Sequence, residues 1–105
     1  MGADKAGNFY AVASGQILKI TKTGQSSVAI DNVPSAVDVA IDKNGRILVL
    51  MVDGISIFDA QGQKLKDLAN GQIVTGAAIY VDNSTIYVAD TGNSRKNSQV
   101  LTFTL

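Results

Sequence analysis

The side chains that could carry out chemistry in this sequence belong to a few kinds only. The chain has 105 residues, with no histidine and no cysteine. This composition excludes cysteine nucleophiles, histidine general bases, disulfides and nearly every zinc or transition-metal site. All nine acidic residues are aspartates, and no serine has a histidine that could activate it as a nucleophile. We therefore expect that the protein is not an enzyme and that it uses no cofactor.

The densest polar cluster lies near the C-terminal end of the sequence. Asn93, Arg95 and Lys96 could bind a ligand or contact an acidic partner, and Asp90 could contribute to the same loop. The structural alternative is that Asp90 accepts hydrogen bonds from turn amides and Gly92 supplies a positive φ. We favour the structural interpretation for this turn. Asn93, Arg95 and Lys96 remain the binding candidates, because their loop departs from the repeat described below.

The aspartates could also include calcium ligands, since calcium prefers six to eight oxygen atoms. No D-x-D-x-D-G spacing occurs in the chain. Instead, Asp4 and Asp42 are 38 residues apart, Asp42 and Asp82 are 40 apart, and each precedes a polar turn. An aspartate that recurs in every copy of a repeat indicates a structural role in a turn. We therefore expect no metal site.

These aspartates belong to an internal repeat of about 40 residues, which sets the organisation of the chain. Gly24 and Gly62, both in turn-like sequences, are also 38 residues apart. The apolar runs of the three copies are residues 9–13, 17–20, 47–52, 55–58, 86–89 and 100–103. Asp and Gly between short apolar runs favour strands joined by tight turns.

The middle copy is the most complete and predicts four strands, which we label a to d. These are residues 36–41, 47–52, 55–58 and 64–68. The second of them is apolar on both faces, which is typical of a strand sandwiched between neighbouring sheets. Four short strands every 40 residues or so is the pattern of a β-propeller blade.

For the whole chain, this pattern predicts an all-β fold of ten strands and no helix. The order is b-c-d, then a-b-c-d, then a-b-c, so both terminal blades lack one strand. The chain is expected to be a single partial propeller domain with blade units at roughly residues 4–33, 34–73 and 74–105.

Three stretches of the sequence resemble the NHL-repeat family of β-propellers. Residues 86–95 (IYVADTGNSR) are similar to the family pattern Ile-Tyr-Val-Ala-Asp-Thr-Gly-Asn-x-Arg. Residues 35–49 (SAVDVAIDKNGRILV) and 55–62 (ISIFDAQG) resemble the stretches that surround it in each repeat. The turn at residues 53–54 departs from the pattern because it lacks the Thr-Gly-Asn insertion, and residues 95–99 are an addition to it.

The resemblance implies a six-bladed propeller that acts mainly as a binding platform for a protein or a small ligand on one face. It favours an extracellular or bacterial envelope location, although residues 1–5 lack the apolar core of a signal peptide. The resemblance also leaves two alternatives open: a propeller fragment, natural or engineered, whose role is assembly alone, and a lactonase-like or lyase-like enzyme.

Charge and hydrophobicity restrict the partners of such a propeller. Nine basic residues balance nine acidic ones, and without a basic stripe we expect no nucleic-acid binding. The longest apolar run, residues 47–52, is too short to insert in a membrane as a helix. An incomplete ring exposes sheet edges and apolar blade faces. The expected partner is therefore a second copy, in a homodimer of half-propellers, unless the chain is excised from a longer six-bladed propeller.

The three tyrosines occupy repeat positions where aromatic side chains matter most. Tyr10 and Tyr87 take the same or adjacent positions in strand b, where we expect packing between blades. Tyr80 takes the position of Ala40 in strand a, near the channel of a propeller. It could line a path for a ligand, so it joins the binding candidates, although packing against neighbours is the simpler expectation.

Overall fold

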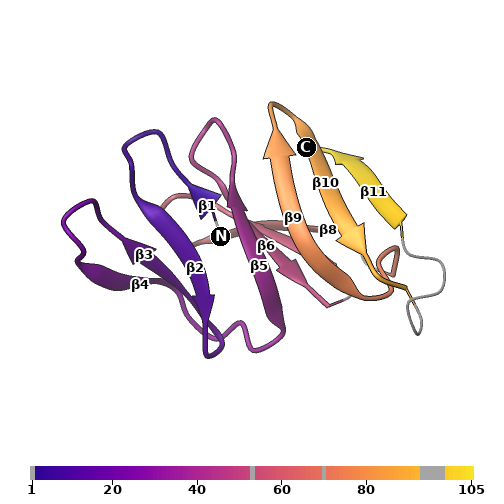
Figure 1. Cartoon of the computed structure of the whole chain (residues 1–105), viewed down its shortest axis with the longest axis horizontal. Helices are drawn as coiled ribbons and strands as arrows, with labels where there is room; N and C mark the ends of the chain where they lie inside the picture. Colours follow the sequence, from indigo (N-terminus) through magenta and orange to yellow (C-terminus); the bar gives the residue numbers. More distant parts are fainter. Residues whose placement is uncertain (1, 53, 70, 93–98) are drawn as a thin grey trace.

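Eleven β-strands and no helix are found in the residues that the structure, a computed structural model, describes: 2–52, 54–69, 71–92 and 99–105. The strands form three separate sheets that lie side by side (Figure 1). The described residues contain no helix with the length and apolarity needed to cross a membrane. The predicted all-β class of antiparallel blades is therefore confirmed.

Each sheet is built from strands that are consecutive in the sequence and antiparallel. The N-terminal sheet consists of β1 (Gly2–Ala3), β2 (Phe9–Ala13), β3 (Gln16–Ile20) and β4 (Ser26–Ile30). The middle sheet consists of β5 (Ala36–Ile41), β6 (Ile47–Met51), β7 (Ile55–Phe58) and β8 (Lys64–Leu68). The C-terminal sheet consists of β9 (Gly76–Asp82), β10 (Thr85–Asp90) and β11 (Gln99–Thr104).

The prediction that the first sheet starts at its second strand is wrong. Gly2 and Ala3 form β1, in which Gly2 pairs with Tyr10 and Ala3 pairs with Phe9. The N-terminal sheet therefore has four strands, as the middle sheet does. Two residues carry too little alternation to reveal a strand in the sequence. The strand forms because the first residues lie within reach of the exposed edge of β2.

The first strands of the three sheets converge on one region of the molecule. β1, β5 and β9 each lie at a sheet edge, and β5 contacts both β1 and β9. From this region the sheets spread outwards, so that β4 and β8 lie at the far edges of their sheets. This radial arrangement is the one by which propeller blades surround a central axis.

The middle sheet is sandwiched between the other two, which explains why its second strand is apolar on both faces. Ile47 and Val49 of β6 join the core shared with the N-terminal sheet. Leu48 and Leu50 join the core shared with the C-terminal sheet. All four side chains are fully buried. Because side chains alternate along a strand, one five-residue strand supplies both cores.

Three of the turns that join consecutive strands share one hydrogen-bond arrangement, in which an aspartate binds backbone amides. Asp42 Oδ1 accepts hydrogen bonds from the backbone amides of Asn44 at 2.9 Å and Arg46 at 2.8 Å. Asp4 and Asp59 bind the amides two and four residues further on in the same way. These side chains replace backbone partners that the turns cannot supply. The predicted structural role is thus confirmed for Asp4 and Asp42.

Asp82, the third copy of the recurring aspartate, behaves differently. It is exposed at the end of β9, and it makes no side-chain hydrogen bond to another described residue. The turn to β10 is only two residues long, and Asn83 takes a positive φ of 54°. In this two-residue turn the carboxylate of Asp82 binds no amide of a described residue, so the predicted role in the turn is wrong for Asp82.

Candidate functional site

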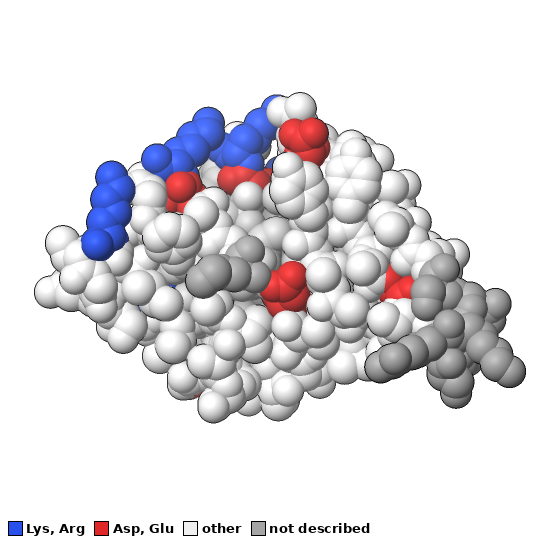
Figure 2. Space-filling view, viewed as in Figure 1, with Lys and Arg blue, Asp and Glu red and all other residues white. Residues whose placement is uncertain are grey.

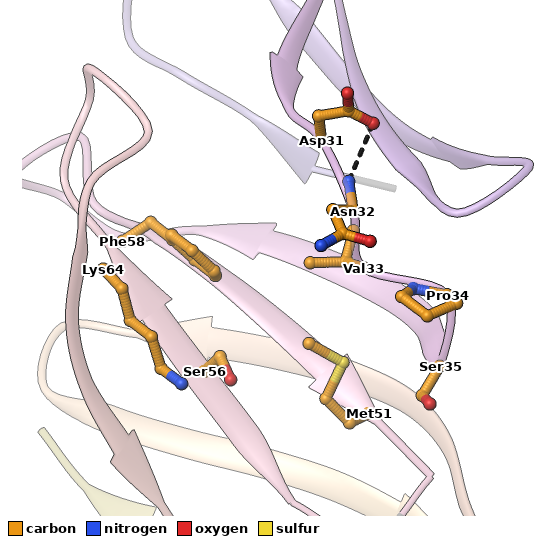
Figure 3. A pocket seen from close by; sticks show the side chains of 9 residues that line it. All are labelled: Asp31, Asn32, Val33, Pro34, Ser35, Met51, Ser56, Phe58 and Lys64. Carbon is orange, nitrogen blue, oxygen red and sulfur yellow. Dashed lines mark hydrogen bonds between the residues drawn. The ribbon is translucent and has the colours of Figure 1, made fainter.

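A groove of about 410 Å³ lies between the N-terminal and middle sheets (Figure 3). One wall is the connector of residues 31–35, and the other is formed by strands of the middle sheet. Its apolar lining includes Val33, Met51 and Phe58. Of these, Val33 and Phe58 are buried in the shared core. The groove is thus a continuation of the junction between two blades.

The connector is held in place by several hydrogen bonds at its start. The carboxylate of Asp31 accepts one from the backbone amide of Asn32 at 2.7 Å and one from the side chain of Gln16 at 3.2 Å. Asn32 adopts a positive φ of 59°, a conformation that asparagine tolerates better than most residues. Val33 then donates its backbone N–H to the carbonyl of Gly15 at 2.8 Å. This wall of the groove is therefore preformed.

The opposite wall carries a small network of polar side chains. Ser56 Oγ donates a hydrogen bond to Asp67 Oδ1 at 2.7 Å, and Lys64 Nζ lies 2.8 Å from Asp67 Oδ2. The hydrogen bond from Lys64 is the main reason why the pKa of Asp67 lies below its ordinary value, and Ser56 adds to this effect. An ammonium group has three donors, and Lys64 is half exposed. It therefore keeps donors for a ligand in the groove.

The chemistry of this groove suits binding. An apolar floor with a few polar groups at its rim is the usual composition of a ligand pocket. Lys64 and Asp31 place opposite charges at the rim, and Ser56 adds a hydroxyl group. Among the described residues, no three acidic side chains are grouped so that they could hold a metal ion. The groove could accept an apolar body that bears polar or charged ends.

Of the sequence-predicted site residues, only Tyr80 belongs to the part of the chain that the structure describes, and it does not line this groove. Asn93, Arg95 and Lys96 fall outside the residues that the structure describes. Tyr80 lies on β9 and lines two smaller hollows. One, of about 260 Å³, lies where β1, β5 and β9 meet, and the other, of about 210 Å³, lies on the C-terminal sheet. The groove was missed because its walls come from three separate stretches of sequence. None of these stretches has a motif of its own.

The turn that contains Asp90 is structural, as we expected. The carboxylate of Asp90 accepts hydrogen bonds from the backbone amides of Val74, Thr75 and Gly92, each at 2.9 Å. The bonds from Val74, then Thr75 and Gly92, hold the pKa of Asp90 below its ordinary value. Gly92 takes a positive φ of 66°. Asp90 thus ties the end of β10 to the segment that precedes β9.

The tyrosines separate into one buried and two exposed residues. Tyr10 is 5% exposed between the N-terminal and middle sheets, and its hydroxyl donates to Asp4 Oδ2 at 3.2 Å. Its predicted packing between blades is confirmed. Tyr80 is 64% exposed and Tyr87 is 38% exposed, with ring centroids 6.2 Å apart. No sheet among the described residues covers that face, so Tyr87 is not buried between blades there, while the ring of Tyr80 lies against that of Tyr87.

Charged side chains gather along one margin of the molecule. Figure 2 shows basic side chains over the turns at the upper margin, with acidic side chains beside them, while most of the same face is uncharged. Arg46 pairs with Asp42 in one of these turns. Pairs of this kind reduce the positive potential that a row of basic side chains would otherwise create.

The antiparallel sheets and their radial arrangement define the class of fold as blades of a β-propeller. Among solved structures, the chain is similar to a calcium-binding protein, regucalcin, from Agrobacterium tumefaciens strain C58, with a TM-score of 0.70. The two share 13% sequence identity, and the match covers 89% of this chain and 38% of regucalcin. The chain thus spans well under half the length of that protein. At this identity the likeness establishes the fold alone.

No family model and no curated protein matches the sequence. The resemblance to the NHL-repeat family therefore stays a prediction, while the broader propeller-type fold that it implied is confirmed.

Proposed function

We propose that this chain is a non-catalytic binding or scaffolding module, built from propeller blades that self-associate to complete a ring. The observation that carries the proposal is that the polar side chains fall into two groups, one bonded within the fold and one open to the groove. Most of the described carboxylates, which an enzyme would need for catalysis, are used to hold turns and strands together. The open groove between the N-terminal and middle sheets offers polar groups at the rim of an apolar floor.

Most of the described aspartates accept hydrogen bonds from other groups of the fold. Asp4, Asp42 and Asp59 close turns, and Asp90 binds three backbone amides. Asp67 is shared between Ser56 and Lys64. A general base must be able to reach a substrate proton at hydrogen-bond distance. Carboxylates that already bind two or three internal donors are poor candidates for that role.

The groove would accept a small ligand, or a short segment of a partner, with an apolar body and an anionic end. The apolar body would lie on Phe58 and Met51, and the anionic end would bind the ammonium group of Lys64. The charges along the turn margin are mixed in sign, which supports the expectation that nucleic acid is not the ligand.

A ligand screen followed by amide chemical-shift mapping tests the proposal. We expect bound compounds to perturb the backbone amides of Asp31, Asn32, Val33, Ser35 and Ser56. Replacing Lys64 with alanine should weaken binding roughly tenfold, since a hydrogen bond to a charged group contributes about 1.5 kcal/mol or more. Lys66→Ala is the matched control, because Lys66 is exposed on the same strand but does not line the groove.

Two results would contradict this binding site. One is a set of bound ligands whose perturbations all lie away from the groove. The other is an equal loss of affinity in Lys64→Ala and Lys66→Ala, which would indicate a nonspecific charge effect. Stoichiometric calcium or another divalent ion in the purified protein would revive the metal-dependent enzyme alternative, and metal analysis measures this directly.

A further inference from the structure

The two ends of the stack of sheets are apolar surfaces that no other sheet of the described residues covers. We define the N face as the side of the N-terminal sheet turned away from the middle sheet, formed by Phe9, Ala11, Leu18, Ile20 and Val28. We define the C face as the side of the C-terminal sheet turned away from the middle sheet, formed by Ala78, Tyr80, Tyr87, Ala89 and Val100.

These faces hold most of the exposed apolar surface. Nine large apolar side chains are exposed among the described residues, and five of them lie on the two faces. Val28 is 49% exposed on the N face, and Val100 is 67% exposed on the C face. None of the ten residues that define the faces is charged. Contiguous apolar surface of this kind marks an interaction site.

The residues of the N face stand at the same repeat positions as the residues of the middle sheet that pack on the N-terminal sheet. Phe9 pairs with Ile20 across β2 and β3. Thirty-eight residues later, Ile47 pairs with Phe58 across β6 and β7, and both are buried in the core that the two sheets share. The N face is therefore the surface that would pack on a preceding blade.

At its periphery the N face is more apolar than its covered counterpart. In the middle sheet, Ser56 pairs with Asp67 at the outer strands, and the pair is polar. The corresponding pair in the N-terminal sheet is Leu18 with Val28. A polar pair can stay hydrated at the rim of a junction between blades, whereas burying an apolar pair stabilises the contact.

The C face occupies the positions with which the middle sheet packs on the C-terminal sheet. Tyr87 pairs with Tyr80 as Leu48 pairs with Ala40, and Leu48 and Ala40 are buried in the second core. In the same way, Val100 pairs with Ala89 where Ile55 pairs with Leu50. The C face is therefore the surface that would pack on a following blade.

We propose that the N face of one copy of this chain docks on the C face of a second copy, and that this contact is made twice around a two-fold axis. The chain carries both halves of one junction between blades, so a second copy supplies the missing neighbour of each face. Two copies contribute six sheets, the number that the family resemblance implies. The inference rests on the proposed self-association and adds its orientation and its contacts.

The orientation follows from the packing inside the chain. Each sheet has one side that packs on the preceding sheet in the sequence and one side that packs on the following sheet. At both internal junctions, the second kind of side of one sheet meets the first kind of side of the next. Head-to-tail contacts continue this order, and they close when the rotation per chain is half a turn. Contacts between two N faces or two C faces would reverse the order of the sheets at the contact.

Paired charge substitutions test the orientation by measuring mass with light scattering after size exclusion. We expect the unmodified chain to have twice the 11.0 kDa mass of one copy. Val28→Asp on the N face and Val100→Asp on the C face should each give a monomer. Leu65→Asp is the control, because Leu65 is 53% exposed on β8 and lies on neither face. This variant should remain a dimer.

Mixing the two variants provides the decisive result. The intact C face of Val28→Asp can dock on the intact N face of Val100→Asp, so an equimolar mixture should form a one-to-one heterodimer. The heterodimer has one contact instead of two and therefore dissociates at a higher concentration than the unmodified ring. Its formation also shows that both variants are folded.

Several outcomes would overturn the inference. A monomeric unmodified chain excludes closure by a second copy. If Val100→Asp stays dimeric while Val28→Asp does not, the contact joins two N faces, and the converse result indicates two C faces. A mixture that stays monomeric rules out head-to-tail docking. Ligand binding at the groove can be measured on the same variants, since the groove involves neither Val28 nor Val100, so failure of docking and failure of the binding site are distinguishable.

Discussion

Asp90 shows how a residue with the appearance of a functional group can be fully occupied by structure. Asp90 is 2% exposed, and its carboxylate binds three backbone amides that come from two separate segments. These bonds favour the ionised form and hold the pKa of Asp90 below the ordinary value of 3.8. The folded state therefore binds this proton less readily than the unfolded chain does.

The pH dependence of stability follows from the direction of that shift. The contribution of Asp90 is fully present above about pH 3.8 and is lost as the pH falls through the lowered pKa of the folded state. Asp90→Asn should lower the free energy of unfolding at pH 7, because it leaves backbone amides without an ionised acceptor. Urea unfolding at several pH values measures both proteins.

The difference between the two unfolding curves is the informative quantity. The difference in the free energy of unfolding should shrink as the pH falls below 3.8, because the unmodified protein then loses the stabilisation that the ionised carboxylate of Asp90 provides. Asp4 and Asp67 also have lowered pKa values, but both proteins contain them, so their effects cancel in the difference. A constant difference from pH 7 to about pH 2.5 would show that the charge of Asp90 contributes little.

At the scale of elements, the turns between the third and fourth strands connect repeat sequence to packing between sheets. Gly24 and Gly62 occupy equivalent turns and have φ values of 87° and 85°. A Cβ atom at Gly24 would meet nothing within 4 Å, whereas one at Gly62 would lie 2.5 Å from the carbonyl oxygen of Ala29 in β4. The second turn thus packs against the neighbouring sheet.

This difference predicts unequal costs for the same substitution. Gly24→Ala should destabilise the fold by about 1–2 kcal/mol, the cost of placing an alanine in a left-handed conformation. Gly62→Ala carries the same cost plus about 1–3 kcal/mol for overpacking against backbone. Chemical denaturation of both variants measures the difference. Equal losses of stability would mean that the two sheets separate easily at this contact.

At the scale of the whole molecule, stability should depend on the concentration of the chain. If two copies bury the N and C faces against each other, association stabilises the folded state by mass action. The Tm of the unmodified protein should therefore rise with protein concentration over a hundredfold range. The Tm of Val28→Asp should not change over the same range. A concentration-independent Tm in both proteins would contradict coupling between closure and folding.

Much of the fold could be predicted because the repeat is expressed in local patterns. Alternation along β5 and the doubly apolar β6 indicate strands whatever surrounds them. The aspartate turns are equally local, since Asp42 binds amides only two and four residues away. β1 escaped prediction because a strand of two residues has no periodicity, and only the edge of β2 gives it a partner.

The candidate site was less predictable, because it depends on which segments meet. Lys64, Phe58 and Val33 lie on different segments and share no motif, yet they line one groove. Tyr87 was expected to be buried from its repeat position, but that position is covered only when another sheet follows. The same position therefore gives a buried side chain in one sheet and an exposed one in another.

By itself, the sequence determined the three-copy repeat, most strands within each copy and the aspartates that close turns in the first two copies. These features arise from interactions over a few residues, which leave a periodic record in the chain. The tertiary structure alone decided that Gly2 and Ala3 complete the first sheet, that a groove opens beside Lys64, and that Tyr80 and Tyr87 stay exposed. Burial depends on the neighbours that packing brings together, and distance along the chain does not record those neighbours.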